Sequence, residues 1–463
     1  LHTGKEILRT SMVGARNVPI LATSFEPVVK KSLSDVRFFF TVALLVNTSV
    51  TIAQSKPDAK MDWFANAKLG IFIHWGIYSV NGIDESWSFH NNYLPYANYM
   101  KQLDGFTADR YDPARWAELI KQSGARYAVL TTKHHDGVAL WPTKLSTLNT
   151  VEKTPARRDL ATPLVESLRK QNLKVGLYYS LLDWSDDRYD GFTKSEKRYD
   201  ITKEPARWNR FVQFYQGQLR ELTTAYRPDL WWFDGDWEHK AEEWKAAETR
   251  KLLLDSNPGV ILNSRLMGHG DYSTPEQDLP LERPKDKYWE LCMTMNESWG
   301  YQPSDKNYKT SSEVIQIFAE CISKGGNMLL GIGPKADGTI PDEQTNILKE
   351  LGRWTNKHSE AIYGTREGLP NGYFYGPSTL STDSTIVYLF LPYKPTGSVM
   401  LKGVKNRINR VWVVGNGTKP AFHVRMRPYW SQNAGLLFID VPAQALDEQM
   451  TVLAVLLDGK LKL

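Results

Sequence analysis

The feature that most constrains this chain is a regular alternation, from Leu69 onward, of short apolar runs with longer amphipathic segments. The short runs are rich in β-branched and aromatic residues, whereas segment 205–226 carries its large apolar residues on one helical face. This alternation is typical of βα units arranged around a parallel sheet. The predicted strands are 69–74, 127–132, 174–179, 230–234, 260–264, 288–294 and 327–333.

Several of these strands end in polar residues, which favours one architecture. A (β/α)₈ barrel places its chemistry at the C-terminal ends of many strands, so we expect a barrel rather than a doubly wound sheet. Only seven strands are clear, so one of the eight units should be degenerate. After about Gly368 short alternating strands separated by turn residues predict an antiparallel β-sandwich. The predicted domains are 55–367 for the α/β barrel and 368–463 for the sandwich, closely packed.

The first 54 residues predict a targeting region. Lys30 and Lys31 precede the apolar run 38–46, which is followed near Ala53 by a small-residue cleavage signal. The run is too short to cross a bilayer, which takes roughly 20 residues, and no later segment qualifies. We therefore expect a signal peptide cleaved near Ala53 and a secreted or periplasmic protein, with no membrane span. A disordered tail with one apolar segment is the alternative, and the translation start stays open.

Charge and cysteine content exclude several functions. The 57 basic and 52 acidic side chains are spread along the chain, so no stretch has the concentrated positive field that nucleic acid requires. Cys292 and Cys321 are too few for a disulfide framework and lack metal-binding spacing. We expect both to be buried thiols, with a single pair as the alternative. The 16 Trp and 22 Tyr slightly favour carbohydrate, because aromatic faces stack on sugar rings. The oligomeric state is not predicted.

Acidic residues just past the predicted strands are candidates for glycoside chemistry, which uses two carboxyl groups that flank the bond to be cut. The best candidate is Asp234, where a buried apolar strand ends in an acid followed by glycine. It would point into the barrel mouth, although capping of the next turn is the alternative. Glu276 lies in a polar, Gly-rich loop that could deliver a proton to a leaving group. Glu282 and Glu290 are rivals that spacing does not exclude.

Three histidines also fall at predicted strand ends, namely His74 and the adjacent His134 and His135. Together with Asp234 they could form a metal site like that of a barrel amidohydrolase. Adjacent histidines on a strand point to opposite faces, which argues against a shared metal, and no His-x-His pair follows the first strand. Imidazoles that hydrogen-bond sugar hydroxyls explain the same residues, so a metal-dependent hydrolase is the alternative.

Short motifs occur in a characteristic order between about residues 60 and 365. They are LGIFIHWG (69–76), KHHDG (133–137), GLYYS (176–180), WFDG (232–235), GDYSTPEQ (270–277), WE (289–290) with SWGY (298–301), and GGNMLL (325–330). In this order they resemble the α-L-fucosidases of glycoside hydrolase family 29. The resemblance implies a retaining enzyme that releases terminal α-L-fucose from fucosylated oligosaccharides or glycoconjugates, on a (β/α)₈-like barrel followed by a β-sandwich. It implies no metal or organic cofactor.

The resemblance also implies roles for individual residues. Asp234 matches the family's nucleophile, which forms a covalent fucosyl-enzyme, and Glu276 matches the acid/base, although the family varies around that loop. Arg265 matches an arginine near the acid/base. The implied sugar contacts are His74, Trp87, His134, His135, Tyr178 (preferred to Tyr179) and Trp232.

One motif departs from the family's pattern. Many members have Glu directly followed by Trp, whereas here Ser86 separates Glu85 from Trp87, which leaves the role of Glu85 open. A catalytically inactive fucose-binding protein is the alternative function of another class. The presence of both Asp234 and Glu276 argues against it, because a lectin gains nothing from burying two acids.

Overall fold

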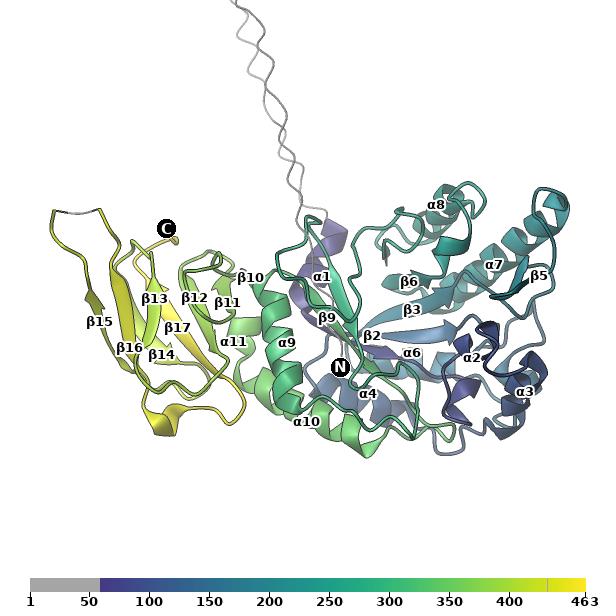
Figure 1. Cartoon of the computed structure of the whole chain (residues 1–463), viewed down its shortest axis with the longest axis horizontal. Coiled ribbons are helices and arrows are strands. Elements are labelled where there is room, and N and C mark those ends of the chain that lie inside the picture. Colours follow the sequence, from purple (N-terminus) through teal and green to yellow (C-terminus); the bar gives the residue numbers. More distant parts are fainter. Residues whose placement is uncertain (1–58, 431) are drawn as a thin grey trace, which may run out of the picture. The chain divides into compact units, whose positions relative to one another are not determined.

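The parallel sheet of the barrel contains a strand at each of the seven predicted places. In a computed structural model that describes residues 59–430 and 432–463, these strands form one sheet in the order β7-β6-β3-β2-β1-β9-β8. Its strands β6, β3 and β2 are labelled side by side in Figure 1. Every residue of β1 and β2 is buried, as their continuous apolar sequence predicts for a sheet covered on both faces. The strands are β1 (Leu69–Ile73), β2 (Tyr127–Lys133), β3 (Lys174–Ser180), β6 (Leu230–Asp234), β7 (Ile261–Leu262), β8 (Glu290–Met293) and β9 (Asn327–Ile332).

The degenerate unit lies between the edge strands β7 and β8. Isolated parallel bridges join segment 271–277 to β7's end through Tyr272 and to the β8 side through Ser273 and Glu276. The segment therefore takes the place of an eighth strand and joins the two edges of the sheet. Its Pro275 has no N–H to donate, which prevents a regular ladder. The predicted barrel with one degenerate unit is confirmed.

Helices alternate with the strands, and their ends follow local sequence signals. Asp112 caps α4 by accepting hydrogen bonds from two backbone N–H groups, and Thr310 and Glu313 form a capping box at α9. The predicted apolar face of α7 is buried. The longer helices are α4 (Pro113–Gln122), α6 (Ala161–Lys170), α7 (Pro205–Tyr226), α8 (Ala246–Ser256), α9 (Ser311–Ser323) and α10 (Asp342–Lys357). The shorter elements are α1 (Asp62–Ala67), α2 (Trp87–His90), α3 (Tyr96–Met100), α5 (Thr150–Lys153), α11 (Ser359–Ile362) and the hairpin of β4 (Gly191–Thr193) and β5 (Glu196–Lys197).

The C-terminal part contains two antiparallel sheets, in the orders β10-β11-β12-β17-β14 and β13-β16-β15. Their facing side chains share one apolar core, which confirms the predicted antiparallel sandwich. The strands are β10 (Thr365–Glu367), β11 (Ser378–Ser381), β12 (Ile386–Leu391), β13 (Val399–Lys402), β14 (Ile408–Val413), β15 (Ala421–Arg425), β16 (Leu436–Asp440) and β17 (Thr451–Leu457).

The sandwich and the barrel helices share buried contacts. Along β12, Val387 packs in the sandwich core, whereas Tyr388 and Phe390 belong to the barrel's core, as period-2 alternation requires. The indole of Trp354 on α10 donates a hydrogen bond of 2.8 Å to the carbonyl oxygen of Met450. The boundary at 367/368 stays a prediction.

Two expectations concern the termini and the thiols. The predicted signal peptide, with its cleavage site near Ala53, lies outside the described residues. None of the helices in the described ranges combines the length and apolar character that a membrane crossing requires. Cys292 and Cys321 are both buried and unpaired.

Candidate active site

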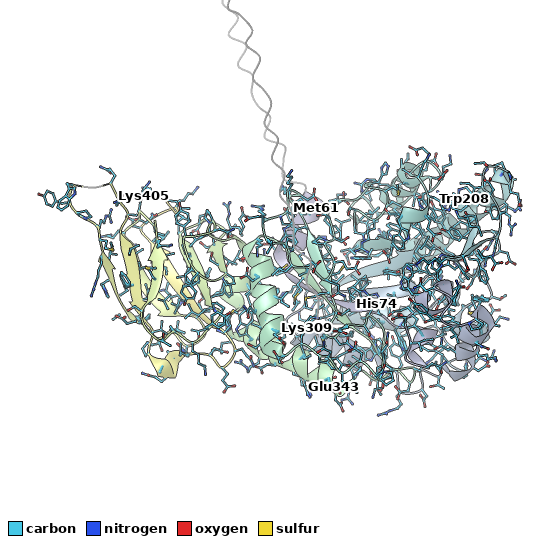
Figure 2. All side chains as sticks on the ribbon, in the orientation of Figure 1. Met61, His74, Trp208, Lys309, Glu343 and Lys405 are labelled. Atoms are coloured by element: carbon cyan, nitrogen blue, oxygen red, sulfur yellow. The ribbon has the colours of Figure 1, made fainter. Side chains whose placement is uncertain are left out.

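The C-terminal ends of the barrel strands surround a cavity of about 180 Å³. His74 follows β1 and lies among the barrel strands in Figure 2, while Asp234 is the last residue of β6. The cavity brings together all of the predicted site residues except His135, which lies just behind its wall. The lining residues are Phe72, His74, Glu85, Trp87, His134, Tyr178, Trp232, Asp234, Trp237, Arg265, Glu276 and Trp299.

Asp234 sits at a rigid strand end. The following Gly235 has φ +82°, and a Cβ there would lie only 2.5 Å from the Leu182 side chain, so both the turn and the close approach require glycine. Asp234 Oδ2 accepts a hydrogen bond of 3.1 Å from the Tyr178 hydroxyl, and Oδ1 accepts one of 3.0 Å from Arg265 Nη1. These two hydrogen bonds fix the orientation of the carboxylate at the strand end.

The second carboxylate, Glu276, comes from the irregular segment 271–277 and binds the same arginine. Its Oε2 accepts a hydrogen bond of 2.6 Å from Arg265 Nη2, while Arg265 Nε donates to Thr274 Oγ1 at 3.0 Å. Since the two Nη atoms of one guanidinium are about 2.3 Å apart, the bound oxygens of Asp234 and Glu276 lie at most about 8 Å from each other. One arginine therefore holds both acids at one cavity.

The histidine pair departs from its predicted geometry. Strand β2 ends at Lys133, so His134 and His135 follow the strand instead of alternating along it. Their ring centroids are 4.2 Å apart, and the expectation that they point to opposite faces was wrong. His134 lines the cavity, whereas His135 Nε2 faces Asp234 Oδ2 at 3.8 Å.

Each of these rings is buried and has a specific neighbour. His134 Nδ1 lies 2.6 Å from Ser86 Oγ, and His135 Nδ1 lies 2.6 Å from Ser180 Oγ. Burial lowers the pKa of both rings well below the usual value, so both are neutral near pH 7. His74 shares that shift for the same reason and stacks on Trp299, with centroids 4.7 Å apart.

The alternative metal site gains no support from this geometry. Within residues 59–430 and 432–463, no group of three or more His, Cys, Asp or Glu side chains is arranged to hold a metal ion. The Nδ1 atoms of His134 and His135 are bonded to serines, and their rings can offer only Nε2 to a ligand.

Aromatic side chains form the walls and the mouth. The ring of Tyr178 stacks on that of Trp232 at 5.7 Å, and Arg265 covers Trp232 with its guanidinium carbon 4.6 Å from the ring centroid. At the mouth, Trp87 at the start of α2 stacks on Trp237 at 6.1 Å, and Trp237 is 51% exposed. This exposed ring can contact a group that extends out of the cavity.

Three lining residues were missed by sequence reasoning, namely Phe72, Trp237 and Trp299. Phe72 reads as strand core, and Trp237 lies three residues beyond Asp234 in a turn with no pattern of its own. Trp299 stands in the matched SWGY motif, which was the available signal.

The other three candidate acids, Glu85, Glu290 and Glu282, differ in their position relative to the cavity. Glu85 lines the cavity, where Oε1 accepts a hydrogen bond of 2.5 Å from the Gly300 N–H and burial raises its pKa to about 7. Glu290 lies outside the lining, wholly buried between the Tyr127 hydroxyl and the Trp232 indole. Glu282 is exposed and accepts a hydrogen bond from Asn371. Neither rival joins Asp234.

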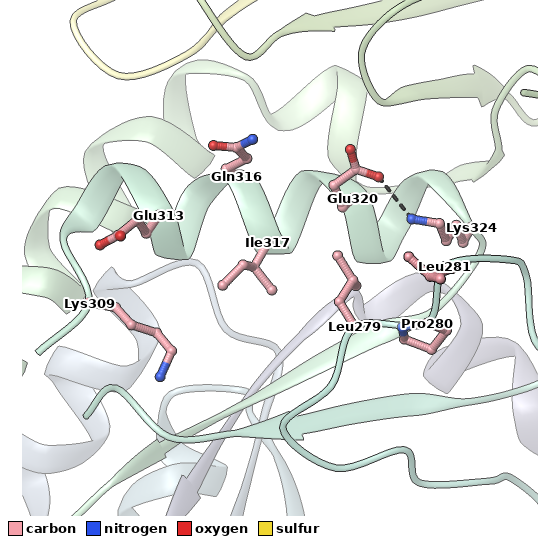
Figure 3. Close-up of a pocket in the computed structure, with 9 residues that line it drawn as sticks. All are labelled: Leu279, Pro280, Leu281, Lys309, Glu313, Gln316, Ile317, Glu320 and Lys324. Carbon is pink, nitrogen blue, oxygen red and sulfur yellow. Dashed lines mark hydrogen bonds and ion pairs between the residues drawn. The ribbon is translucent and has the colours of Figure 1, made fainter. Parts of the chain in front are cut away.

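A larger cavity of about 490 Å³ lies between α9 and the loop 279–281 (Figure 3). Its two acids already have partners, because Glu313 caps α9 and Glu320 binds Lys324 of the same lining at 2.9 Å. This cavity offers no free pair of carboxyl groups for glycoside chemistry.

Comparisons with known proteins agree with this geometry. Residues 46–360 match the family model described as α-L-fucosidase. An α-L-fucosidase of Branchiostoma floridae is 34% identical over 66% of this chain and 72% of its own length, and human tissue α-L-fucosidase is 32% identical over 66% and 69%.

Solved structures give the same result. α-L-Fucosidase isoenzyme 1 from Paenibacillus thiaminolyticus has a TM-score of 0.78 and 31% identity, covering 86% of this chain and 99% of its own. A trapped covalent intermediate of a family 29 α-L-fucosidase from Bacteroides thetaiotaomicron has a TM-score of 0.77 and 28% identity, covering 87% and 97%. The family model covers most of the chain, so this protein belongs to the α-L-fucosidase family, glycoside hydrolase family 29.

Proposed function

We propose that this protein releases terminal α-L-fucose from fucosylated oligosaccharides or glycoconjugates by double displacement, with Asp234 as nucleophile and Glu276 as acid/base. The observation that carries the assignment is the single guanidinium of Arg265, which binds both carboxylates at the cavity. The upper bound on their separation includes the roughly 5–5.5 Å of retaining enzymes. Support for retention also comes from the covalent intermediate trapped in a relative.

In the first step Asp234 attacks the anomeric carbon while Glu276 protonates the departing glycosidic oxygen. The bond to the leaving group breaks as the ester bond to Asp234 forms. Since Oε2 of Glu276 accepts from Arg265 at 2.6 Å, the proton for the leaving group is carried and delivered by the other oxygen, Oε1. In the second step Glu276 takes a proton from water, which attacks the same carbon and frees Asp234.

The sugar is held by the buried polar groups at the base of the cavity, His74, His134 and Tyr178, against the Trp232 ring. A volume of about 180 Å³ is below the roughly 300–1,000 Å³ of pockets for drug-sized ligands. It suits one sugar ring, which explains action on a terminal residue. His135 lies outside the lining with Nε2 3.8 Å from Asp234 Oδ2, so it can contact only a sugar hydroxyl that lies next to that carboxylate.

Turnover of 4-nitrophenyl α-L-fucoside tests the function. The wild type should release nitrophenol, and Asp234→Ala should abolish release. Glu276→Ala should retain much of the activity on this good leaving group and respond to added azide. A fucose-binding protein without turnover would bind fucose but release no nitrophenol. If azide rescues neither variant and Glu276→Ala behaves like wild type, the acid/base assignment is lost.

We also propose that the enzyme is exported. The apolar run 38–46 and the cleavage signal near Ala53 support this, and the relatives include a plasma α-L-fucosidase of rat. N-terminal sequencing of the protein recovered outside the producing cell should begin just after Ala53. Retention of the full-length chain in the cytoplasm would overturn export.

A further inference from the structure

Two buried serines stand behind the two adjacent histidines of the site. Ser86 immediately precedes α2 and Ser180 ends β3, and both are wholly buried. Each places its hydroxyl oxygen 2.6 Å from the Nδ1 atom of one ring, Ser86 at His134 and Ser180 at His135. A neutral imidazole carries one proton, so the state of Nδ1 determines the state of Nε2.

The proton between Ser180 and His135 belongs to the histidine. Ser180 Oγ also lies 2.6 Å from the carbonyl oxygen of Leu182, which only accepts, so the single hydroxyl proton of Ser180 is used there. The hydrogen bond to His135 therefore needs a proton on Nδ1. Since this buried ring is neutral, its Nε2 carries a lone pair.

The opposite holds for His134. Among the described residues, the Ser86 hydroxyl has one hydrogen-bond partner, His134 Nδ1. A buried hydroxyl proton without an acceptor is unfavourable, so Ser86 donates to Nδ1. The neutral ring then carries its proton on Nε2.

We propose that Ser86 and Ser180 fix opposite tautomers on His134 and His135, so that neighbouring rings present a hydrogen-bond donor and an acceptor to the bound sugar. The use of these rings for sugar hydroxyls rests on the proposed function. A hydroxyl next to His134 Nε2 must accept, and one next to His135 Nε2 must donate. The serine that separates Glu85 from Trp87, where the chain departs from the family's pattern, acquires a positioning role.

The arrangement also concerns the nucleophile. The lone pair of His135 Nε2 faces Asp234 Oδ2 at 3.8 Å, and that oxygen accepts from Tyr178. A proton on Nε2 would instead bind Asp234 and reduce its reactivity. Ser180 is thus a positioning residue that keeps this side of His135 free of a proton.

The ring nitrogens can be observed directly in the uninhibited, full-length protein labelled with ¹⁵N-histidine. We expect the His135 ring to be protonated on Nδ1 and the His134 ring on Nε2. Ser180→Ala should change the His135 signals alone and Ser86→Ala the His134 signals alone, while Ser86→Thr, which keeps the hydroxyl, should restore the wild-type pattern. The proposal is overturned if His134 and His135 carry the same tautomer in the wild type. The wild-type spectrum gives this answer even if an alanine variant fails to fold.

Substrate analogues give a second readout. In fucosides with one hydroxyl replaced by fluorine or by hydrogen, fluorine still accepts weakly but cannot donate. At the hydroxyl facing His134, replacement by fluorine should lower kcat/KM less than replacement by hydrogen. At the hydroxyl facing His135, either replacement should lower kcat/KM about tenfold or more. Ser180→Ala should reduce the loss at the latter position. Equal losses for both replacements at every position overturn the proposal. Absence of all fucoside turnover with opposite tautomers in the spectrum would refute the proposed function only.

Discussion

The two carboxylates of the site come from contrasting parts of one barrel. Asp234 ends a regular strand, and its side chain is 13% exposed, whereas Glu276 belongs to a segment joined by isolated bridges and is 37% exposed. A nucleophile must hold its distance to the anomeric carbon, while an acid/base must move a proton to one group and from another. The regular strand and the irregular segment match these two demands.

Substitution of the two acids should show the largest effect. Asp234→Asn replaces the charged carboxylate by an uncharged amide, a far weaker nucleophile, so kcat/KM should fall by on the order of 10⁴-fold or more for every leaving group. Glu276→Gln should cost far less with nitrophenol than with an oligosaccharide, because only the poor leaving group needs the proton. Steady-state kinetics with both substrates checks this. Equal losses for the two variants on both substrates would contradict the contrast.

Arg265→Lys should separate the two acids. A lysine is a single point charge and cannot bind Asp234 and Glu276 as a fork, so kcat/KM should fall by roughly 10²–10³-fold. Arg283 pairs with Glu367 away from the cavity, so Arg283→Lys is the matched control and should keep wild-type activity. Activity of Arg265→Lys within a factor of two of the control would show that the fork is dispensable.

A pair of glycines tests the difference in rigidity. Gly235→Ala adds a clash with Leu182 to a positive φ of +82° and should cost about 3 kcal/mol of unfolding free energy. Gly268→Ala has a similar φ of +78° but nothing within 4 Å, and should cost about 1 kcal/mol. Urea unfolding of both variants measures the costs. If Gly268→Ala is the more destabilising variant, the chain next to Asp234 is not the more rigid of the two regions.

The buried Glu290, which is bonded to Tyr127 and Trp232, should make the stability of the protein depend on pH. Burial raises its pKa to about 7, so the folded state binds its proton more tightly than the unfolded state. Its stabilising contribution is complete below about pH 4 and is lost as the pH rises through 7, by on the order of 3 kcal/mol. Unfolding free energies measured between pH 4 and 8 should fall in the wild type and fall less in Glu290→Gln. Parallel curves for the two proteins would refute this.

The barrel was readable from sequence because each of its seven strands is covered on both faces, which produces continuous apolar runs such as 69–73. The eighth segment was not readable, since 271–277 pairs through isolated bridges and carries polar residues. The same difference applies to the site. Asp234 stands out at the end of an apolar strand, while Trp237 has no sequence pattern and is placed at the cavity by ring contacts with Trp87 and His135.

The sequence by itself determined the seven strands, the sandwich and the residues that match the family's motifs, because apolar periodicity and motif order are local properties of the chain. Only the tertiary structure decided which acid shares Arg265 with Asp234, and that Glu290 is buried and bonded to Trp232 of the cavity wall. It also decided that His134 and His135 lie side by side, because the end of β2 at Lys133 removes the strand's alternation. The hydrogen bonds between Ser86 and His134 and between Ser180 and His135 join residues 48 and 45 positions apart, so they cannot be read from local pattern.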